Sequence, residues 1–169
     1  MRGMRWQTLL ALALTFAALG AQAQVLNFRA HLSGAEEVPS NTSPAQGQAT
    51  FRVAADGSLI HFRLNVANIE NVTMAHIHLA PAGANGPVVA WLYPAAPPPQ
   101  LIEGRSDGVL SAGVITSANL VGPLAGQTLH DLIAHLADGN AYVNVHTSQF
   151  PGGEIRGQLS QGPPVPHHH

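Results

Sequence analysis

The stretch ATFRVAADGSLIHFRLNV, residues 49–66, decides the fold class of this chain. Apolar residues alternate with polar ones through both halves of the stretch. They are Ala49, Phe51 and Val53 in the first half and Ile60, Phe62, Leu64 and Val66 in the second. Period-two alternation puts the apolar side chains on one face of a β-strand, and Asp56-Gly57 between the halves is typical of a tight turn. The stretch therefore predicts a hairpin that packs on a core by one face.

Similar short apolar or alternating segments lie on either side of this hairpin. We predict further strands at residues 25–33, 75–79, 88–93, 108–116, 142–147 and 154–159, with loops at 34–47, 81–87 and 94–100 and a turn at 68–72. One helix is expected at 129–137, because Thr128 and Asp131 resemble a capping pair and Gly139 can end it. One short helix among many strands predicts an all-β, antiparallel β-sandwich with Greek-key-like connections.

The N-terminal segment has the features of a secretory signal peptide. Arg2 and Arg5 precede an apolar run over residues 9–19, and Ala21-Gln22-Ala23 provides a cleavage site. The run is shorter than the roughly 20 residues of a membrane span. We expect residues 1–23 to be removed, residues 24–160 to form one domain, and the Pro- and His-rich residues 161–169 to be a disordered tail. His167–His169 are either native metal-binding residues or an added tag.

The amino-acid composition argues against several classes of function. The chain has 7 basic residues, none of them lysine, and 9 acidic ones, so loss of Arg2 and Arg5 leaves 5 against 9 and a net charge of about −4. Such a chain is a poor partner for nucleic acid or an anionic membrane. The absence of cysteine removes disulfides, thiolate metal sites and cysteine nucleophiles. No serine-histidine-aspartate triad, phosphate-binding loop or nucleotide fingerprint is found.

Three histidines on two predicted strands are the strongest candidates for chemistry. His76 and His78 share one face of their strand, and His146 lies opposite Val143 and Val145 on a later one. If the two strands are neighbours, three neutral imidazoles converge, which suits copper, or zinc with an open fourth position. The simpler alternative is that these histidines are polar side chains on the outer face of a sheet and bind no metal.

Additional ligands are less clearly indicated. Met74 has the parity of His76 and His78, so its thioether is a candidate soft ligand, although packing is its commoner role. His31, on a polar face, and Glu37, in a loop before Pro39, are other candidates for which surface placement is the default. We regard these residues as weaker candidate ligands than the three histidines.

Two charged residues follow His146 in the sequence. Glu154 and Arg156 share the polar face of the last predicted strand. The carboxylate of Glu154 is suited to orient a ligand histidine through its second ring nitrogen. The alternative is that Glu154 and Arg156 form an ion pair that holds the turn.

Several long motifs resemble the chordin-type (CHRD) domain family. They are GAEEVP (residues 34–39), AHIHLAPAGANGPVV (75–89), LVGPLAG (120–126) and AYVNVHTSQFPGGEIRGQL (141–159). The resemblance implies a β-sandwich related in architecture to the copper-zinc superoxide dismutases. In those enzymes an H-x-H strand and a later V-x-H strand supply copper ligands, and His76, His78 and His146 match this pattern.

Departures from the dismutases are also visible. The chain has no histidine shortly after His78 to bridge two metals, no zinc loop rich in His and Asp, and no cysteine pair. The resemblance therefore implies a mononuclear copper site. In a dismutase-like enzyme, Arg156 would attract superoxide toward the metal as the one catalytic candidate.

These observations lead to one main functional hypothesis and two alternatives. The main one is an exported, periplasmic or secreted, copper-binding protein for copper sequestration, delivery or sensing, with a protein partner for metal transfer. The alternatives are a copper-only, superoxide dismutase-like enzyme and a non-catalytic extracellular adhesion module. The sequence leaves the oligomeric state open.

Overall fold

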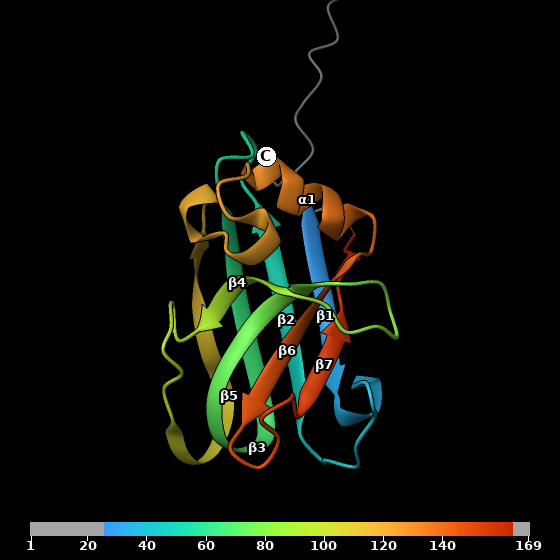
Figure 1. Ribbon diagram of the computed structural model, residues 1–169, viewed down its shortest axis with the longest axis vertical. Coiled ribbons are helices and arrows are strands. Elements are labelled where there is room, and N and C mark those ends of the chain that lie inside the picture. The colour runs from blue at the N-terminus through green and yellow to red at the C-terminus, as the bar shows by residue number, and fades with distance from the viewer. Residues whose placement is uncertain (1–25, 164–169) are drawn as a thin grey trace, which may run out of the picture.

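The computed structural model describes residues 26–163 (Figure 1). The predicted signal peptide and His167–His169 lie outside these residues. The described part contains eight strands, one α-helix and three short 3₁₀ helices. The strands are β1 (Asn27–Ser33), β2 (Gln46–Val53), β3 (Ile60–Leu79), β4 (Val88–Tyr93), β5 (Ile102–Ile115), β6 (Ala141–Thr147), β7 (Ile155–Gln158) and β8 (Ser160–Gln161). The helices are α1 (Leu129–Ala137) and the 3₁₀ turns Gly34–Glu36, Ser117–Asn119 and Gly122–Leu124.

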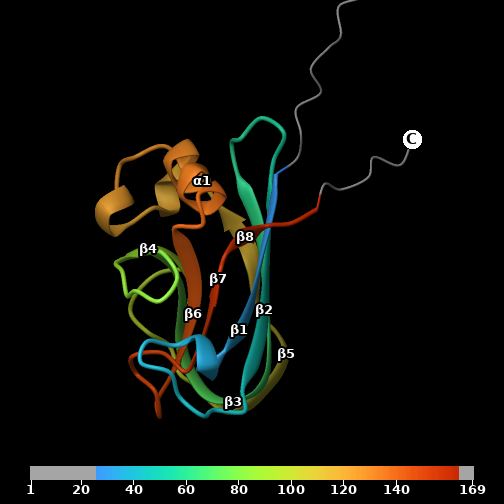
Figure 2. The ribbon, with the colours of Figure 1, turned by 90° about the vertical axis from the view of Figure 1, so that its right-hand side faces the viewer.

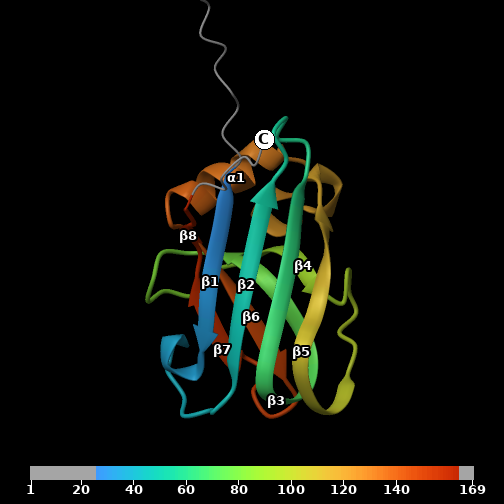
Figure 3. The ribbon, with the colours of Figure 1, turned by 180° about the vertical axis from the view of Figure 1, so that it is seen from behind.

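The strands form two layers that share β3. One layer holds β1, β2, β5 and the first half of β3 (Figure 3), and the other holds β7, β6, β4 and the second half of β3. All pairings are antiparallel, and β1 pairs with β7. Because β2 pairs with both β1 and β3, the ladder closes on itself. The predicted all-β sandwich with one short helix is confirmed.

β3 bends from one layer into the other, as Figure 2 shows at its lower end. The bend falls at Asn68 and Asn71, whose φ angles are 56° and 54°, and the register against β5 shifts on either side of it. Asparagine is one of the few residues other than glycine that adopt this backbone region readily. The predicted turn at 68–72 is therefore wrong, because the chain passes through this segment as one bulged strand.

The core lies between the layers and is built by the alternating residues of each strand. Phe28, Phe51 and Leu64 from the first layer and Ile77 and Val143 from the second are almost fully buried. The helix α1 covers one end of the sandwich (Figure 2) with its apolar stripe. Its N-terminus has the predicted capping box between Thr128 and Asp131. Among residues 26–163 no helix combines the length and hydrophobicity that a membrane crossing requires.

Candidate metal centre

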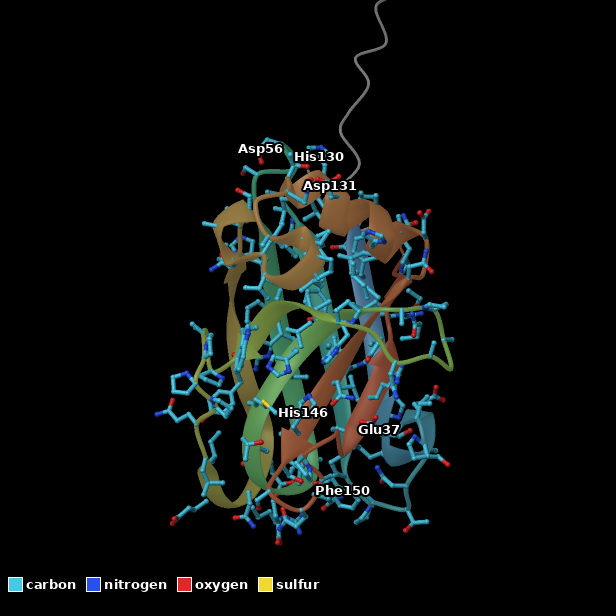
Figure 4. All side chains as sticks on the ribbon, viewed as in Figure 1. Glu37, Asp56, His130, Asp131, His146 and Phe150 are labelled. Atoms are coloured by element: carbon cyan, nitrogen blue, oxygen red, sulfur yellow. The ribbon has the colours of Figure 1, made fainter. Side chains whose placement is uncertain are left out.

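The second layer places the three predicted histidines on its outer face. In the β3–β6 ladder, His76 is opposite Asn144, Met74 is opposite His146, and His78 is opposite Tyr142. The alternate residues Ala75, Ile77, Val143 and Val145 point into the core. Burial of these apolar residues fixes the register, since a shift of one position would exchange the two faces. Figure 4 shows His146 on the side of β6 away from the first layer.

The three imidazoles converge although they come from two strands. One ring nitrogen of each histidine lies within 4.8 Å of those of the other two. Nδ1 of His76 is 3.3 Å from Nε2 of His146. The side chains of His76, His78 and His146 are 2%, 9% and 6% exposed. The cluster is therefore covered from solvent, unlike histidines that decorate a sheet.

Backbone carbonyls set the orientation of two of the rings. Nδ1 of His78 donates to the carbonyl of Gly86 at 2.9 Å, and Nδ1 of His146 donates to the carbonyl of Pro151 at 3.0 Å. Each bond places the proton on Nδ1 and leaves Nε2 with its lone pair. A histidine that binds a metal through one ring nitrogen usually donates its other ring N–H to a carbonyl or carboxylate in the same way.

All three rings are held in their neutral form. Burial lowers the pKa of His76 to about 3, and the nearby His146 and His78 act in the same direction. Burial also lowers the pKa of His146 to about 4, although its hydrogen bond to Pro151 opposes the change. The pKa of His78 is lowered mainly by burial. Neutral imidazole is the form that binds a metal.

The residues fit a mononuclear metal ion. Nε2 of His76 and Nε2 of His78 are buried without a hydrogen-bond partner among the described atoms, an arrangement that normally costs free energy. A nitrogen ligand lies about 2.0–2.1 Å from zinc, so two ligands of one ion are at most about 4.2 Å apart. The 4.8 Å within which the three ring nitrogens lie is close to this limit.

Aromatic rings and a buried guanidinium surround the histidines. The ring of Trp91 meets that of His76 edge-on with centroids 4.2 Å apart, and Tyr142 stacks on His78 at 4.8 Å. The guanidinium carbon of Arg156 lies 3.5 Å from the centroid of Tyr142. Because β6 lies between β3 and β7, Tyr142 separates His78 from Arg156.

Arg156 anchors the segment between β3 and β4 over this face. Its guanidinium donates to the side chain of Asn85 at 2.8 Å and to the carbonyl of Ala84. This segment crosses in front of β6 and β7 (Figure 1) and carries Gly86, the acceptor for His78. Arg156 is 2% exposed. Its contacts fix this loop over the second layer.

A second polar group is buried beside the histidines. Both carboxylate oxygens of Glu37 accept from Nδ2 of Asn144, at 3.0 and 3.1 Å. Burial raises the pKa of Glu37 to about 7, and Arg156 and Asn144 offset only part of this rise. Gly153 lies against the pair, and an added Cβ there would be under 3.0 Å from Asn144 and Glu37 atoms. Glu37 therefore holds a loop to β6 and is outside the histidine cluster.

The other candidate residues are placed differently from one another. Met74 is half-buried and faces His146 across the ladder. His31 is exposed on β1 in the other layer. Glu154 accepts from Ser43 and Thr147, both at 2.6 Å, and makes no hydrogen bond to a histidine. The ion pair with Arg156 that we considered for Glu154 is also not formed among the described side chains.

The sequence interpretation did not identify Trp91, Tyr142 and Asn144 as neighbours of the site. Tyr142 and Asn144 have the same strand parity as His146, so alternation was a sufficient signal for them. The acceptors on Gly86 and Pro151 are backbone carbonyls, so the residue types at these positions could not indicate their role. Their position depends on how two loops fold over the sheet.

Comparison with known proteins gives one match. The family model described as the CHRD domain matches residues 28–159, which is most of the chain. No curated protein and no solved structure matches it. The architectural relation to the dismutases stays a prediction.

Proposed function

Because this chain belongs to the CHRD-domain family and brings three buried histidines together, we propose that it binds a single copper ion through His76, His78 and His146. The observation that carries the proposal is the pair of buried Nε2 atoms without partners, on His76 and His78. A metal ion at the centre of the cluster would satisfy both lone pairs. Zinc is the alternative ion for a three-imidazole site.

Exported copper sequestration, delivery or sensing is the role that this site supports best. CHRD domains occur in extracellular and secreted proteins, which agrees with the signal peptide predicted for residues 1–23. Binding by neutral rings alone lets the ion arrive and leave without breaking a carboxylate or thiolate bond. Copper is the ion that nitrogen ligands hold most tightly among the divalent first-row metals.

The chain itself contributes orientation and shielding. The carbonyls of Gly86 and Pro151 fix the Nδ1 protons of His78 and His146, so both rings meet the ion without first changing tautomer. Trp91 and Tyr142 cover the rings of His76 and His78. Copper, when bound, would supply one-electron redox chemistry. A dismutase reaction has weaker support, because Arg156 is buried and engaged with the 80–87 segment.

Titration of the metal-free protein with copper(II), copper(I) and zinc(II) tests this proposal. Trp91 is the only tryptophan beyond the predicted signal peptide and lies against His76, so its fluorescence reports binding. His167–His169 are replaced by alanine in every variant to remove a competing tail site. We expect one ion per chain. His76→Ala and His146→Ala should each weaken affinity by about 100-fold or more, since outer-shell changes alone cost 10–100-fold.

His61→Ala is the matched control, because His61 is exposed on the other layer. Its affinity should equal that of the parent protein. Weak copper binding that neither cluster variant reduces would overturn the proposal. If copper binds and superoxide then disappears faster than with the His146→Ala variant, the dismutase function is supported as well.

A further inference from the structure

Among residues 26–163, the outer face of the first layer carries most of the exposed arginines. Arg29, Arg52 and Arg63 are exposed on β1, β2 and the first half of β3 (Figure 3). Of the other two arginines in the described residues, Arg105 pairs with Asp107 at 2.7 Å and Arg156 is buried. A chain whose net charge is negative therefore presents one cationic surface, which we call the arginine face.

Strand register places the three arginines at nearby positions on one face of the sheet. Arg52 is opposite His61 on β3, and Thr50 is opposite both Arg29 on β1 and Arg63 on β3. Arg52 is thus the diagonal neighbour of both other arginines, and such neighbours are about 7–8 Å apart.

No carboxylate balances this cluster. β1, β2 and residues 60–67 of β3 contain no Asp or Glu. The one ion pair found among residues 26–163 joins Arg105 to Asp107, on another part of the surface. Like charges at neighbouring positions of a sheet destabilise it. An anionic ligand that bridges the three arginines would remove this cost.

The same surface is hollowed between the arginines. A groove of about 350 Å³ is lined by Arg29, Arg52, His61 and Arg63. A neighbouring groove of about 310 Å³ is lined by Arg29, His31 and Gln48. The two grooves share Arg29, and the first is also lined by Phe28, Phe51 and Phe62.

We propose that the arginine face binds an acidic polysaccharide. Guanidinium groups recognise carboxylates and sulfates through paired hydrogen bonds, while Gln48 and Thr50 offer partners for sugar hydroxyls. The outward positions of β1, β2 and residues 60–67 hold no aromatic or large apolar side chain. The exposed Val109 and Val114 lie on β5, at the edge of this layer, beside Asn65 and His61. A protein interface has an apolar centre and a membrane-surface element has an apolar face, whereas the centre of this face is cationic.

Binding of polygalacturonate, a linear carboxylated polysaccharide, tests the proposal on the full chain. We expect binding that weakens between 50 and 300 mM salt, because screening shortens the range of the attraction. A triple Arg29→Gln, Arg52→Gln, Arg63→Gln variant should bind at least tenfold more weakly. Its thermal unfolding midpoint should match or exceed that of the parent protein. Arg105→Gln, which removes an equal charge per site elsewhere, should bind like the parent.

Several outcomes separate this proposal from others. Equal binding of neutral dextran, or an undiminished affinity of the triple variant, would overturn it. It would also fail if phosphatidylglycerol vesicles or duplex DNA bound through these arginines while polygalacturonate did not. Arginine-dependent binding of dextran sulfate would support it and identify sulfate as an accepted group. His146→Ala should bind the polysaccharide normally, so failure of the metal proposal leaves this one standing.

Discussion

Burial of the histidine cluster predicts that the metal-free protein loses stability in mild acid. The folded-state pKa values of His76 and His146 are about 3 and 4, against an ordinary value of 6.5 for histidine. Below pH 6.5 the unfolded chain therefore binds protons that the folded chain excludes. The free energy of unfolding falls by about 1.36 kcal/mol per pH unit for each such histidine.

Glu37 opposes this effect. Its folded-state pKa is about 7, against an ordinary value of 4.5 for glutamate, so between these pH values the folded chain binds one proton more than the unfolded chain. Stability rises by about 1.36 kcal/mol per unit as pH falls through this range. Between pH 6.5 and 5, His76 and His146 lower the free energy of unfolding while Glu37 raises it. The net loss of stability is about 2 kcal/mol. The lowered pKa of His78 adds to the loss.

Urea denaturation at pH 6.5 and 5.0, with a chelator present, measures this change. Glu37→Gln removes the opposing group, so its loss should approach about 4 kcal/mol. His76→Gln removes one acid-sensitive group, and its loss should be about 2 kcal/mol smaller than that of the parent. The reasoning is refuted if the stability of the parent protein is constant or rises between pH 6.5 and 5.0, or if the stability of all three proteins changes by the same amount.

Three further substitutions test the packing around the site and the core. Gly153→Ala should destabilise the protein by about 2–4 kcal/mol in thermal denaturation, since its φ is 128° and the new Cβ would be under 3.0 Å from buried polar atoms. Gly152→Ala, with open space around it, should change little, and equal effects at both glycines would contradict the argument. Thr128→Ala removes the helix cap and should cost about 1 kcal/mol in urea denaturation; no loss would mean that the capping box is not stabilising. Leu132→Ala, at a fully buried position, should cost about 2–5 kcal/mol by the same assay, and a cost below 1 kcal/mol would show that the helix packs loosely.

Strand parity made much of the candidate site predictable. The two-residue period fixed which residues share a face with His76 and His78, because the core demands Ala75 and Ile77 on the other face. The helix was equally clear, since its cap and apolar stripe are local. The helix begins directly after Thr128 and ends at Ala137, as expected.

Features that depend on long-range packing were not predictable in the same way. Asn68 and Asn71 have the backbone preference of a turn, and the same preference serves a bulge within a strand. Arg156 looked like a surface charge, because nothing in its own strand indicates that the 80–87 segment covers it. Glu37 is likewise buried only because its loop folds back onto β6.

The bend in β3 makes chain length itself a determinant of where the histidine cluster forms. The half of the strand up to Ala67 is registered against β2, while the half after Val72 is registered against β6. An insertion or deletion of one residue between these halves, unless a bulge absorbed it, would turn His76 and His78 into the core and Ile77 outward. The segment 94–100 between β4 and β5 belongs to no strand, so it can change length without moving these histidines. The strand that carries His76 and His78 is therefore less tolerant of a length change than this segment.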